Sequence, residues 1–474
     1  MKNYVFLPLY RSFGFRYLVS TGLIKHLAKR FKIVVFIDIE KKSFYEPFFD
    51  GIDVIYENLN TKKIDEKKNS IFLDYIHILK KFTCGQRENY KNNSIHMWKV
   101  KFNEEIKKKK FFFIYFIGFI LRNSKILRKL FFNFEKLIDP KNIFNHYFEK
   151  YKPKAVILTS YGYDYDQYFV RDSKKFQCKS ISIIYSWDNP TSKGYKSSES
   201  DLYLVWNKTM KDELNIFHDI PSKKIKVCGV SHWDIFFDQL KDREILKDDF
   251  YKENSINRKN RIILFFSSAP RDFKNSFKII ESILEKFKNE KNITLVARMH
   301  PHYMDDTMCD KYLKNKSSFF INQLKKKFKE KLIFKNPNII KFGKNSSEVF
   351  YPIDDMKELA KLYSSANLFI NEYSTTQLEA CIFNLPIINA AIGNYRNTNH
   401  NLSIYEQHHH LWNLKKYEFT KNIKDYKELH DEIKTQINNP KELEHNRKKF
   451  IGVFLGDVKG KGSENIINNV NDLI

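Results

Sequence analysis

The sequence predicts an α/β protein built from two doubly wound domains that face each other across a cleft. Short apolar runs that predict buried strands alternate with helical stretches over residues 1–236 and again over residues 260–447. Polar clusters follow several of these runs directly. In parallel α/β sheets this is the place of ligands, outside the carboxyl ends of the strands.

The composition indicates a folded, strongly basic protein. The chain has 474 residues, of which 42% are hydrophobic, and its formal net charge is +27. This charge favours anionic partners such as lipid head groups, nucleotides, acidic glycans or nucleic acid. Because Lys, Asn, Ile and Phe are abundant throughout, part of the charge also reflects compositional bias.

The five cysteines and the apolar segments indicate the cellular compartment of the protein. The cysteines form no CxxC pair, which argues against a zinc knuckle or a disulfide framework and favours a reducing compartment. The first residues, MKNYVFLPLY, do not resemble a signal peptide. The longest apolar run, Phe111–Leu121, is too short to span a bilayer. We therefore expect a cytoplasmic protein, peripheral at the inner face of the membrane.

The first domain opens with a predicted strand at Tyr4–Leu9, a helix at 17–31 and a second strand at Ile33–Ile37. The loop after the first strand has a single glycine instead of GxGxxG, so no dinucleotide fingerprint is present. This loop either binds an anionic acceptor through Arg11, Gly14 and Arg16, or these residues are simply solvated.

Residues 74–137 interrupt the alternation of predicted strands and helices with a helical insertion rich in Lys and aromatic residues. A run of four lysines precedes Phe111–Leu121, and basic residues then alternate with Ile, Leu and Phe up to Phe132. This pattern fits helices lying in an anionic membrane interface. The alternative is a helical hairpin buried against the domain, with the lysines as its wet face.

The first domain resumes with four predicted strands and ends in two polar segments. The loop at 186–194 offers Asp188 and two candidate acceptor-binding residues, Asn189 and Lys193, and the turn at 229–234 offers His232 and Asp234. The strands are expected at Ala155–Thr159, Ile181–Tyr185, Leu202–Trp206 and Ile225–Cys228.

The second domain is expected to follow a linker at 237–259, and a final helix within 448–474 is expected to cross back onto the first domain. Its strands are predicted at Arg261–Phe266, Ile293–Ala297, Leu332–Phe334 and Leu368–Ile370.

Three strand ends in the second domain predict a nucleotide site. Hydroxyls, one Arg, one His and a helix start can orient and neutralise phosphates. Ser374 with Gln377 predicts a capping box at that helix start, and Glu379 is placed to accept from a ribose. The candidate donor-binding residues are Ser267, Ser268, Arg298, His300, Pro301, Ser374, Thr375, Thr376 and Glu379.

For an inverting transfer, Asp188 is the first candidate for the base that removes the acceptor's proton, followed by His232 and Asp234. Asp188 could instead cap a turn, and His232 with Asp234 could be a structural pair; a retaining reaction would need no such base. The run at 408–410 is expected to be surface histidines, and no DxD-like pair follows a strand in the second domain. Metal-independent chemistry is therefore predicted.

Three segments carry a family resemblance: RMHP at Arg298–Pro301, NEYSTTQLEA at Asn371–Ala380 and KVCGVSHWD at Lys226–Asp234. They resemble glycosyltransferases of the GT-B fold, with two Rossmann-like domains. The His-Pro pair and the Ser/Thr cluster resemble more narrowly the CDP-glycerol glycerophosphotransferases and bacterial sialyltransferases. This resemblance implies His300 and Pro301 near base or ribose, and Ser374 and Thr375 at phosphate. Thr375 stands where these families usually have a second Ser, and the acidic motif of the sialyltransferases is not evident. The identity of the nucleotide's base therefore stays open.

The leading prediction is a glycosyltransferase that moves a sugar from a nucleotide-activated donor of the CMP, CDP, UDP or GDP type to a surface-polysaccharide or lipid-linked acceptor, without another cofactor. One alternative is a CDP-polyol phosphotransferase. UDP-N-acetylglucosamine 2-epimerases share the fold, but their acidic, Gly-rich loops are not seen. A basic nucleic-acid-binding protein is the non-enzyme alternative; against it, no aromatic-interleaved stacking motif is visible and no specific nucleic-acid partner is expected.

Overall fold

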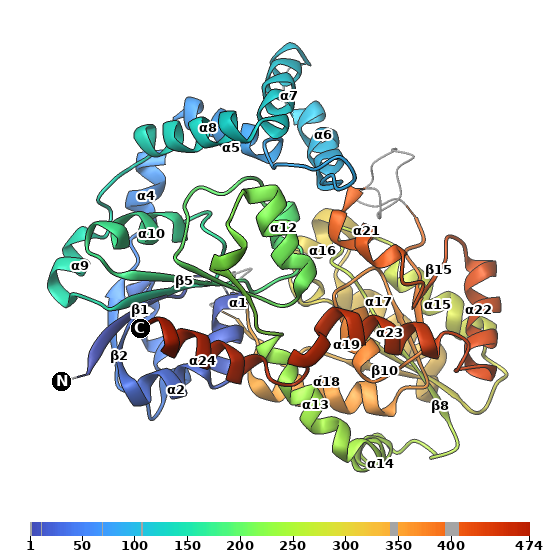
Figure 1. The fold of residues 1–474 in the computed structure, drawn as a ribbon. Helices are drawn as coiled ribbons and strands as arrows, with labels where there is room; N and C mark the ends of the chain where they lie inside the picture. Colours follow the sequence, from blue (N-terminus) through green and yellow to red (C-terminus); the bar gives the residue numbers. More distant parts are fainter. Residues whose placement is uncertain (1, 11, 69, 106–107, 342–348, 394–406) are drawn as a thin grey trace. The chain divides into compact units, whose positions relative to one another are not determined.

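The structure is a computed structural model that describes residues 2–10, 12–68, 70–105, 108–341, 349–393 and 407–474. Its chain forms two compact units. Unit 1 comprises Met1–His232, Leu402–Asn413 and Asp457–Ile474, and unit 2 comprises Trp233–Asn401 and Leu414–Gly456. Each unit contains its own parallel sheet covered by helices (Figure 1).

Unit 1 is organised on a seven-stranded sheet in the order β3-β2-β1-β4-β5-β6-β7. All neighbouring strands are parallel; Val5 in β1 pairs with Ile33 on one side and Ala155 on the other. β4, at the centre of the sheet, is apolar throughout because helices cover both faces of the sheet. The strands are β1 Asn3–Pro8, β2 Phe31–Ile37, β3 Val54–Asn58, β4 Ala155–Leu158, β5 Lys179–Ile183, β6 Leu202–Val205 and β7 Ile225–Val227.

The helix predicted at 17–31 is broken. A π-helical turn spans Arg16–Ser20, and Gly22, with φ of +74°, separates it from α2 (Leu23–Arg30). Only glycine adopts this left-handed conformation without strain, so the helix restarts there. The other helices of this sheet are α1 Ser12–Phe15, α3 Lys42–Tyr45, α4 Thr61–Lys68, α9 Asn145–Tyr151, α10 Asp166–Lys175, α11 Asn189–Ser192 and α12 Lys208–His218.

The predicted insertion is helical, and its helices share a small core of their own. Phe82, Phe111, Ile114 and Phe131 are among the buried residues of this core. The helices are α5 Ile71–Lys81, α6 Ser94–Glu105, α7 Lys108–Asn123 and α8 Lys125–Ile138. Across the described residues, no helix combines the length and the apolar character needed to cross a membrane.

Unit 2 has a six-stranded parallel sheet in the order β10-β9-β8-β13-β14-β15, plus a two-stranded antiparallel ribbon of β11 and β12. The sheet strands are β8 Arg261–Phe266, β9 Ile293–Arg298, β10 Leu332–Lys335, β13 Leu368–Asn371, β14 Ile387–Asn389 and β15 Lys421–Asn422; the ribbon joins β11 Ile340–Lys341 to β12 Val349–Phe350. Ile263, Phe265, Leu295 and Ile370 are fully or almost fully buried in its core.

Residues 237–259, expected as a linker, are mostly helical. They include the end of α13 (Asp234–Gln239) and all of α14 (Arg243–Glu253), in which Phe250 and Tyr251 are buried. Apolar side chains at these positions explain why the segment packs within unit 2. The other helices of unit 2 are α15 Ser276–Lys286, α16 Asp306–Leu313, α17 Ser317–Phe328, α18 Ile353–Ser365, α19 Thr376–Ile382, α22 Tyr426–Asn438 and α23 Glu444–Leu455. Most of α21 (His409–Lys415) belongs to unit 1.

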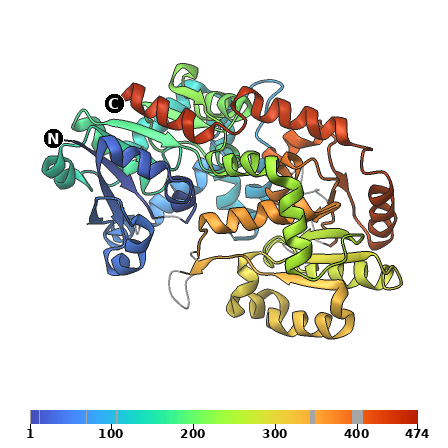
Figure 2. The same ribbon diagram turned by 90° about the horizontal axis from the view of Figure 1, so that it is seen from below.

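The C-terminal segment 448–474 contains two helices instead of one. The end of α23 lies in unit 2, and α24 (Gly462–Leu473) belongs to unit 1. There α24 lies beside α2 (Figure 1 and Figure 2). Asn465 Nδ2 donates to the carbonyl of Cys228 at 3.1 Å, which holds α24 at the end of β7.

Candidate functional site

The loops that follow β8, β9 and β13 meet at the carboxyl end of the unit 2 sheet. The His300 N–H donates to Ser267 Oγ at 2.8 Å, which joins the β9 loop to the β8 loop. The Ser268 N–H donates to Glu372 Oε2 at 2.7 Å, which joins the β8 loop to the β13 loop. The strand order β9-β8-β13 makes these loops neighbours. The structure therefore brings Ser267, Ser268 and His300 together, as the sequence predicts.

Glu372 lies at the centre of this site, and sequence reasoning missed it. Its carboxylate also accepts from Ser276 Oγ at 3.1 and 2.9 Å, and the Tyr303 hydroxyl donates to Ser276 Oγ at 2.9 Å. The side chain is buried. Burial raises its pKa from 4.5 to about 8, although the hydrogen bonds from Ser268 and Ser276 oppose the shift. Its position directly after β13 was the available signal.

His300 is held as a neutral hydrogen-bond donor. Its Nδ1 accepts from the His302 N–H at 3.1 Å, so the ring proton lies on Nε2. Burial, reinforced by the neighbouring His302, lowers its pKa to about 3. Pro301 then starts the 3₁₀ turn Pro301–Met304, for which its fixed φ is suited. The His-Pro pair thus presents one imidazole N–H at a fixed place beside Ser267.

Arg298, expected to bind the donor, is held by one nitrogen of its guanidinium in a buried ion pair. Its Nη2 donates to Asp355 Oδ1 at 2.6 Å, and both side chains are almost fully buried. Asp355 Oδ1 also accepts from the Asn338 N–H at 2.7 Å. The guanidinium therefore ties β9 to α18 inside unit 2.

The predicted capping box is wrong. α19 begins at Thr376, its N-cap Thr375 makes no side-chain cap hydrogen bond, and the side-chain oxygen of Gln377 accepts from Asn389 instead. The N–H groups of Gln377 and Leu378 donate to the carbonyls of Ser374 and Thr375 at 3.1 and 2.9 Å. The Thr376 N–H reaches Ser374 Oγ at 3.4 Å. The turn thus occupies N–H groups that were expected to be free for phosphate, while the side chains of residues 374–376 stay partly exposed.

Glu379 is buried inside unit 2. Its Oε1 accepts from Trp233 Nε1 at 3.3 Å and its Oε2 accepts from the Tyr363 hydroxyl at 2.9 Å. Both oxygens are therefore engaged by side chains of α18 and of the segment before α13, which contrasts with the expected ribose contact.

In unit 1, Asp188 lies in the loop after β5 and is held ionised. Ser186 Oγ and Ser192 Oγ donate to its carboxylate, the latter at 2.8 Å. Burial would raise its pKa, but Lys193, His410 and the two hydroxyls outweigh burial and hold it at about 2. Such a carboxylate is a weak base near neutral pH.

The histidines at 408–410 are not surface residues, contrary to expectation. His408 and His409 are buried, and His410 packs edge-on against Trp187 with ring centroids 4.7 Å apart. Burial lowers the pKa of His410 to about 4, with Asp188 opposing that shift. The chain returns to unit 1 at these residues, which local sequence does not reveal. Within the described residues, no cluster of three or more His, Cys, Asp or Glu could hold a metal ion.

His232 and Asp234 do not lie in the same unit. His232 ends unit 1, where it is buried and stacks edge-on against Tyr17 at 4.8 Å; burial lowers its pKa well below 6.5. Asp234 is the first residue of α13 in unit 2.

The expected acceptor-binding residues are spread over the carboxyl end of the unit 1 sheet. Arg11 lies outside the described residues. Gly14 packs against Thr159, where an added Cβ would lie 3.4 Å from the threonine side chain. Arg16 starts the π-helical turn, Asn189 is buried at the start of α11, and the Lys193 carbonyl accepts from Lys81 Nζ at 2.7 Å.

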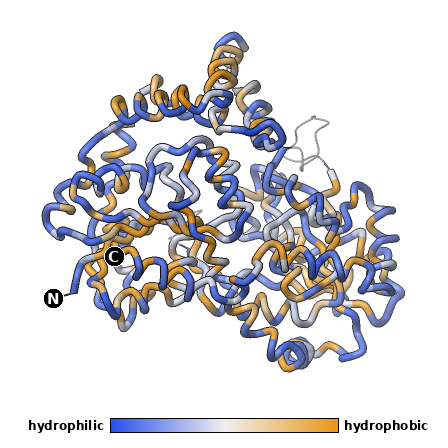
Figure 3. Tube along the Cα trace, in the orientation of Figure 1, coloured by the Kyte–Doolittle hydropathy of each residue, from blue (hydrophilic) through white to orange (hydrophobic). Residues whose placement is uncertain are grey.

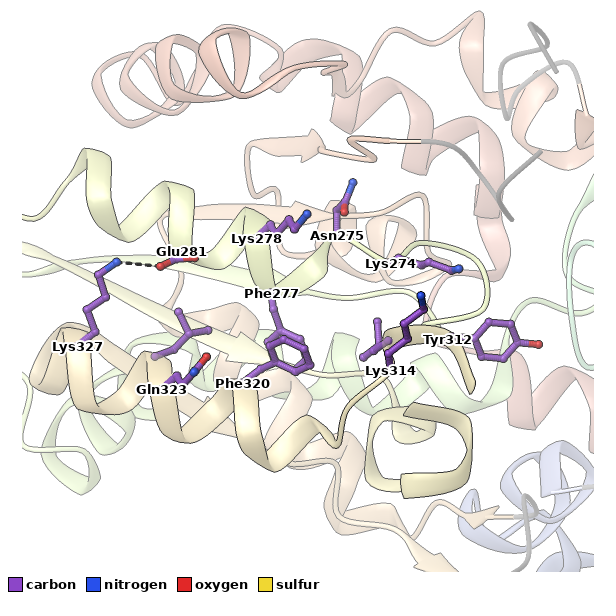
Figure 4. Close-up of a pocket in the computed structure, with 12 residues that line it drawn as sticks. Lys274, Asn275, Phe277, Lys278, Glu281, Tyr312, Lys314, Phe320, Gln323 and Lys327 are labelled. Atoms are coloured by element: carbon purple, nitrogen blue, oxygen red, sulfur yellow. Dashed lines mark hydrogen bonds and ion pairs between the residues drawn. The ribbon is translucent and has the colours of Figure 1, made fainter. Parts of the chain in front are cut away.

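A separate hollow of about 690 Å³ lies on the helical side of unit 2, between α15, α16 and α17 (Figure 4). Phe277 and Phe320 stack at its floor, with ring centroids 4.9 Å apart. Lys274, Lys278 and Lys314 line it, whereas none of the residues predicted from the sequence does.

No protein-family model matches the chain, and no curated protein sequence matches it. Solved structures share its fold, among them the following two. A UDP-GlcNAc 2-epimerase from Neisseria meningitidis bound to UDP-GlcNAc has a TM-score of 0.53 and 14% identity, with 100% of both chains covered. A variant of the wall teichoic acid polymerase TagF has a TM-score of 0.50 and 10% identity, covering 100% of this chain and 89% of that chain. The protein has the GT-B fold. At these identities the likeness establishes the fold alone.

Proposed function

We propose that the protein is a glycosyltransferase that takes a sugar from a nucleotide-activated donor bound at the carboxyl end of the unit 2 sheet. One observation carries the proposal: the β8, β9 and β13 loops are joined there through His300 to Ser267 and through Ser268 to Glu372. A fixed imidazole N–H, hydroxyl groups and a buried carboxyl can orient base, ribose and phosphates by hydrogen bonds.

The fold supports a nucleotide ligand. One structure with this fold holds UDP-GlcNAc, and another is a polymerase of wall teichoic acid. An epimerase and a polymerase on one fold mean that the reaction must be argued from the site. Transfer of a polyol phosphate from a CDP donor therefore remains the second candidate.

In unit 1, we assign the removal of the acceptor's proton to Asp188 together with His410. Asp188 stays ionised at pH 7, and its negative charge raises the pKa of the neighbouring His410 against the effect of burial, so the carboxylate would stabilise a proton taken up by the imidazole. The acceptor is proposed to be a surface glycan or a lipid-linked glycan.

We further propose that the protein works at an anionic membrane surface. The α7 helix exposes one face rich in phenylalanine: Phe112 is 70% exposed, Phe113 64% and Phe116 51%. Lys109 and Lys110 are exposed at the start of the same helix. Aromatic residues beside lysines suit the boundary between acyl chains and head groups.

A thermal-shift screen with UDP, GDP, CDP and CMP tests the donor assignment. One nucleotide should raise the melting temperature, and the corresponding nucleotide sugar should then be consumed in the presence of a glycan acceptor. A CDP preference with transfer of glycerol phosphate would instead establish the polyol phosphotransferase. Sequence-blind, salt-sensitive DNA binding without any nucleotide shift would reject both enzymes.

A further inference from the structure

The α8 helix divides its surface into three stripes. Arg128, Phe131, Phe132 and Glu135 are buried. Ile126, Leu130, Phe134 and Leu137 recur at the spacing of one helix face and are all exposed, Ile126 by 74% and Leu137 by 69%. Lys125, Lys129 and Lys136 follow the same spacing one position earlier along the chain and form a basic stripe beside the apolar one. Figure 3 shows the resulting alternation of hydrophobic and hydrophilic positions along α7 and α8.

Two buried ion pairs fix which stripe faces outward. Arg128 binds Asp219 through two hydrogen bonds, Nε to Oδ2 at 2.7 Å and Nη2 to Oδ1 at 3.0 Å. Lys80 Nζ donates to Glu135 Oε1 at 2.7 Å. Breaking a buried pair leaves an uncompensated charge, so α8 cannot rotate to hide its apolar stripe.

The basic stripe ends in a pocket. A hollow of about 220 Å³ lies at the carboxyl end of α8 and is lined by Lys136 and Lys141 and, from α10, by Arg171, Lys174 and Lys175. Its two carboxylates are already engaged: Asp172 accepts from the Phe144 N–H and pairs with Lys175, and Glu199 binds Lys196 and Lys224. Arg171 pairs with Asp139.

The pocket carries an excess of positive charge. Lys141 and Lys174 form no ion pair with a described residue. Burial lowers the pKa of Lys136, and repulsion from Lys174 and Arg171 adds to this shift. Burial also lowers the pKa of Lys174, although attraction to Glu199 opposes the shift. An anion in the pocket would relieve this repulsion.

We infer that this pocket binds the phosphate head group of an anionic glycerophospholipid while the exposed apolar stripe of α8 lies in the membrane interface. The inference rests on the membrane contact proposed above and not on the transferase chemistry. Because a pocket with several cations gains most from a doubly charged head group, it favours a terminal phosphate over a phosphodiester. The lysines of the pocket thereby determine which lipid the protein prefers, and the apolar stripe binds the membrane equally well with any lipid head group.

The test compares binding of the full chain to phosphatidylcholine vesicles that carry either phosphatidic acid or phosphatidylglycerol at matched surface charge. Wild type should bind the phosphatidic acid vesicles more tightly by about fivefold or more. The pocket variant K136Q/K174Q should lose this preference. The matched variant K125Q/K129Q also loses two positive charges, both of them from α8 and outside the pocket; it should bind both vesicles more weakly but keep the ratio of the two affinities.

Three results would overturn the inference. The wild type could bind phosphatidic acid and phosphatidylglycerol vesicles with equal affinity, both double variants could lose the preference for phosphatidic acid equally, or the protein could bind no vesicles at all. Competition by inorganic phosphate is the remaining measurement. Displacement from phosphatidic acid vesicles by inorganic phosphate, but not by salt of equal ionic strength, is expected for a pocket that binds the terminal phosphate; a thermal shift by inorganic phosphate without any preference between the vesicles would overturn the inference in favour of a site for free phosphate. Failure of the membrane contact itself would be visible separately, because it removes vesicle binding without changing a nucleotide-induced thermal shift.

Discussion

Ser268 holds Glu372 with two hydrogen bonds: its N–H donates to Oε2 at 2.7 Å, and its hydroxyl donates to the Glu372 carbonyl at 2.6 Å. These bonds lock the end of β8 to the end of β13, and the carboxyl group that they hold is buried. A carboxyl with a pKa near physiological pH in a candidate ligand site is characteristic of functional positions.

The stability of unit 2 should depend on the protonation of Glu372. Its pKa rises from 4.5 to about 8 on folding, so the folded chain keeps a proton that the unfolded chain releases. The free energy of unfolding should therefore fall as pH rises from about 4.5 towards about 8, with a slope approaching about 1.4 kcal/mol per pH unit. Glu372→Gln should flatten this dependence in denaturant titrations across that range. Glu290→Gln, at an exposed carboxylate, should leave the slope unchanged; an unaltered slope in Glu372→Gln would contradict the assignment.

His300 should be needed for the nucleotide and not for the fold. His300→Asn keeps an oxygen that can accept from the His302 N–H, but removes the Nε2–H donor. We expect this variant to retain the melting temperature of the free protein and to lose most of the shift caused by the preferred nucleotide, with about a tenfold or greater loss of affinity. If His300→Asn binds like wild type while His300→Ala melts early, the imidazole only caps the turn.

Replacing Arg298, a candidate donor-binding residue, should destabilise the protein. The side chain is buried in a pair with Asp355, so removal of either partner should cost about 3–5 kcal/mol. The double variant R298A/D355A should cost less than the sum of the two single losses. Lys357→Ala, which removes an exposed pair with Asp354, should cost less than about 1 kcal/mol. Additive losses in chemical denaturation would show that the buried pair is not coupled.

The phenylalanine face of α7 should be required for membrane contact. F112S/F116S removes two exposed rings without touching the core of the insertion. Partitioning onto anionic vesicles should fall by about tenfold or more, because each ring contributes apolar area to the interface. Phe319→Ser, at a 45% exposed ring on α17, should have no effect on partitioning. Equal partitioning of wild type and F112S/F116S would place the contact elsewhere.

The strands, the helical insertion and the meeting of the Ser267, Ser268 and His300 segments were predictable because their signals are local. Val5, Ile263 and Leu368 lie in apolar runs whose length and flanking turns identify buried parallel strands, and polar residues directly after such runs lie at the sheet's carboxyl edge. The exposed rings of α7 and α8 were likewise visible as apolar residues interleaved with lysine.

Which polar groups are free was decided by tertiary structure. Arg298 and Glu379 stand where a nucleotide site predicts them, yet Asp355, 57 positions away, binds Arg298 Nη2, and Trp233, 146 positions away, binds Glu379 Oε1. His410 is polar and was expected at the surface, but the chain returns to unit 1 there and buries it against Trp187. The type of a residue determines which hydrogen bonds its side chain can form. Partners distant in sequence determine which of these bonds are already formed within the protein, and burial then determines the protonation state of the side chain.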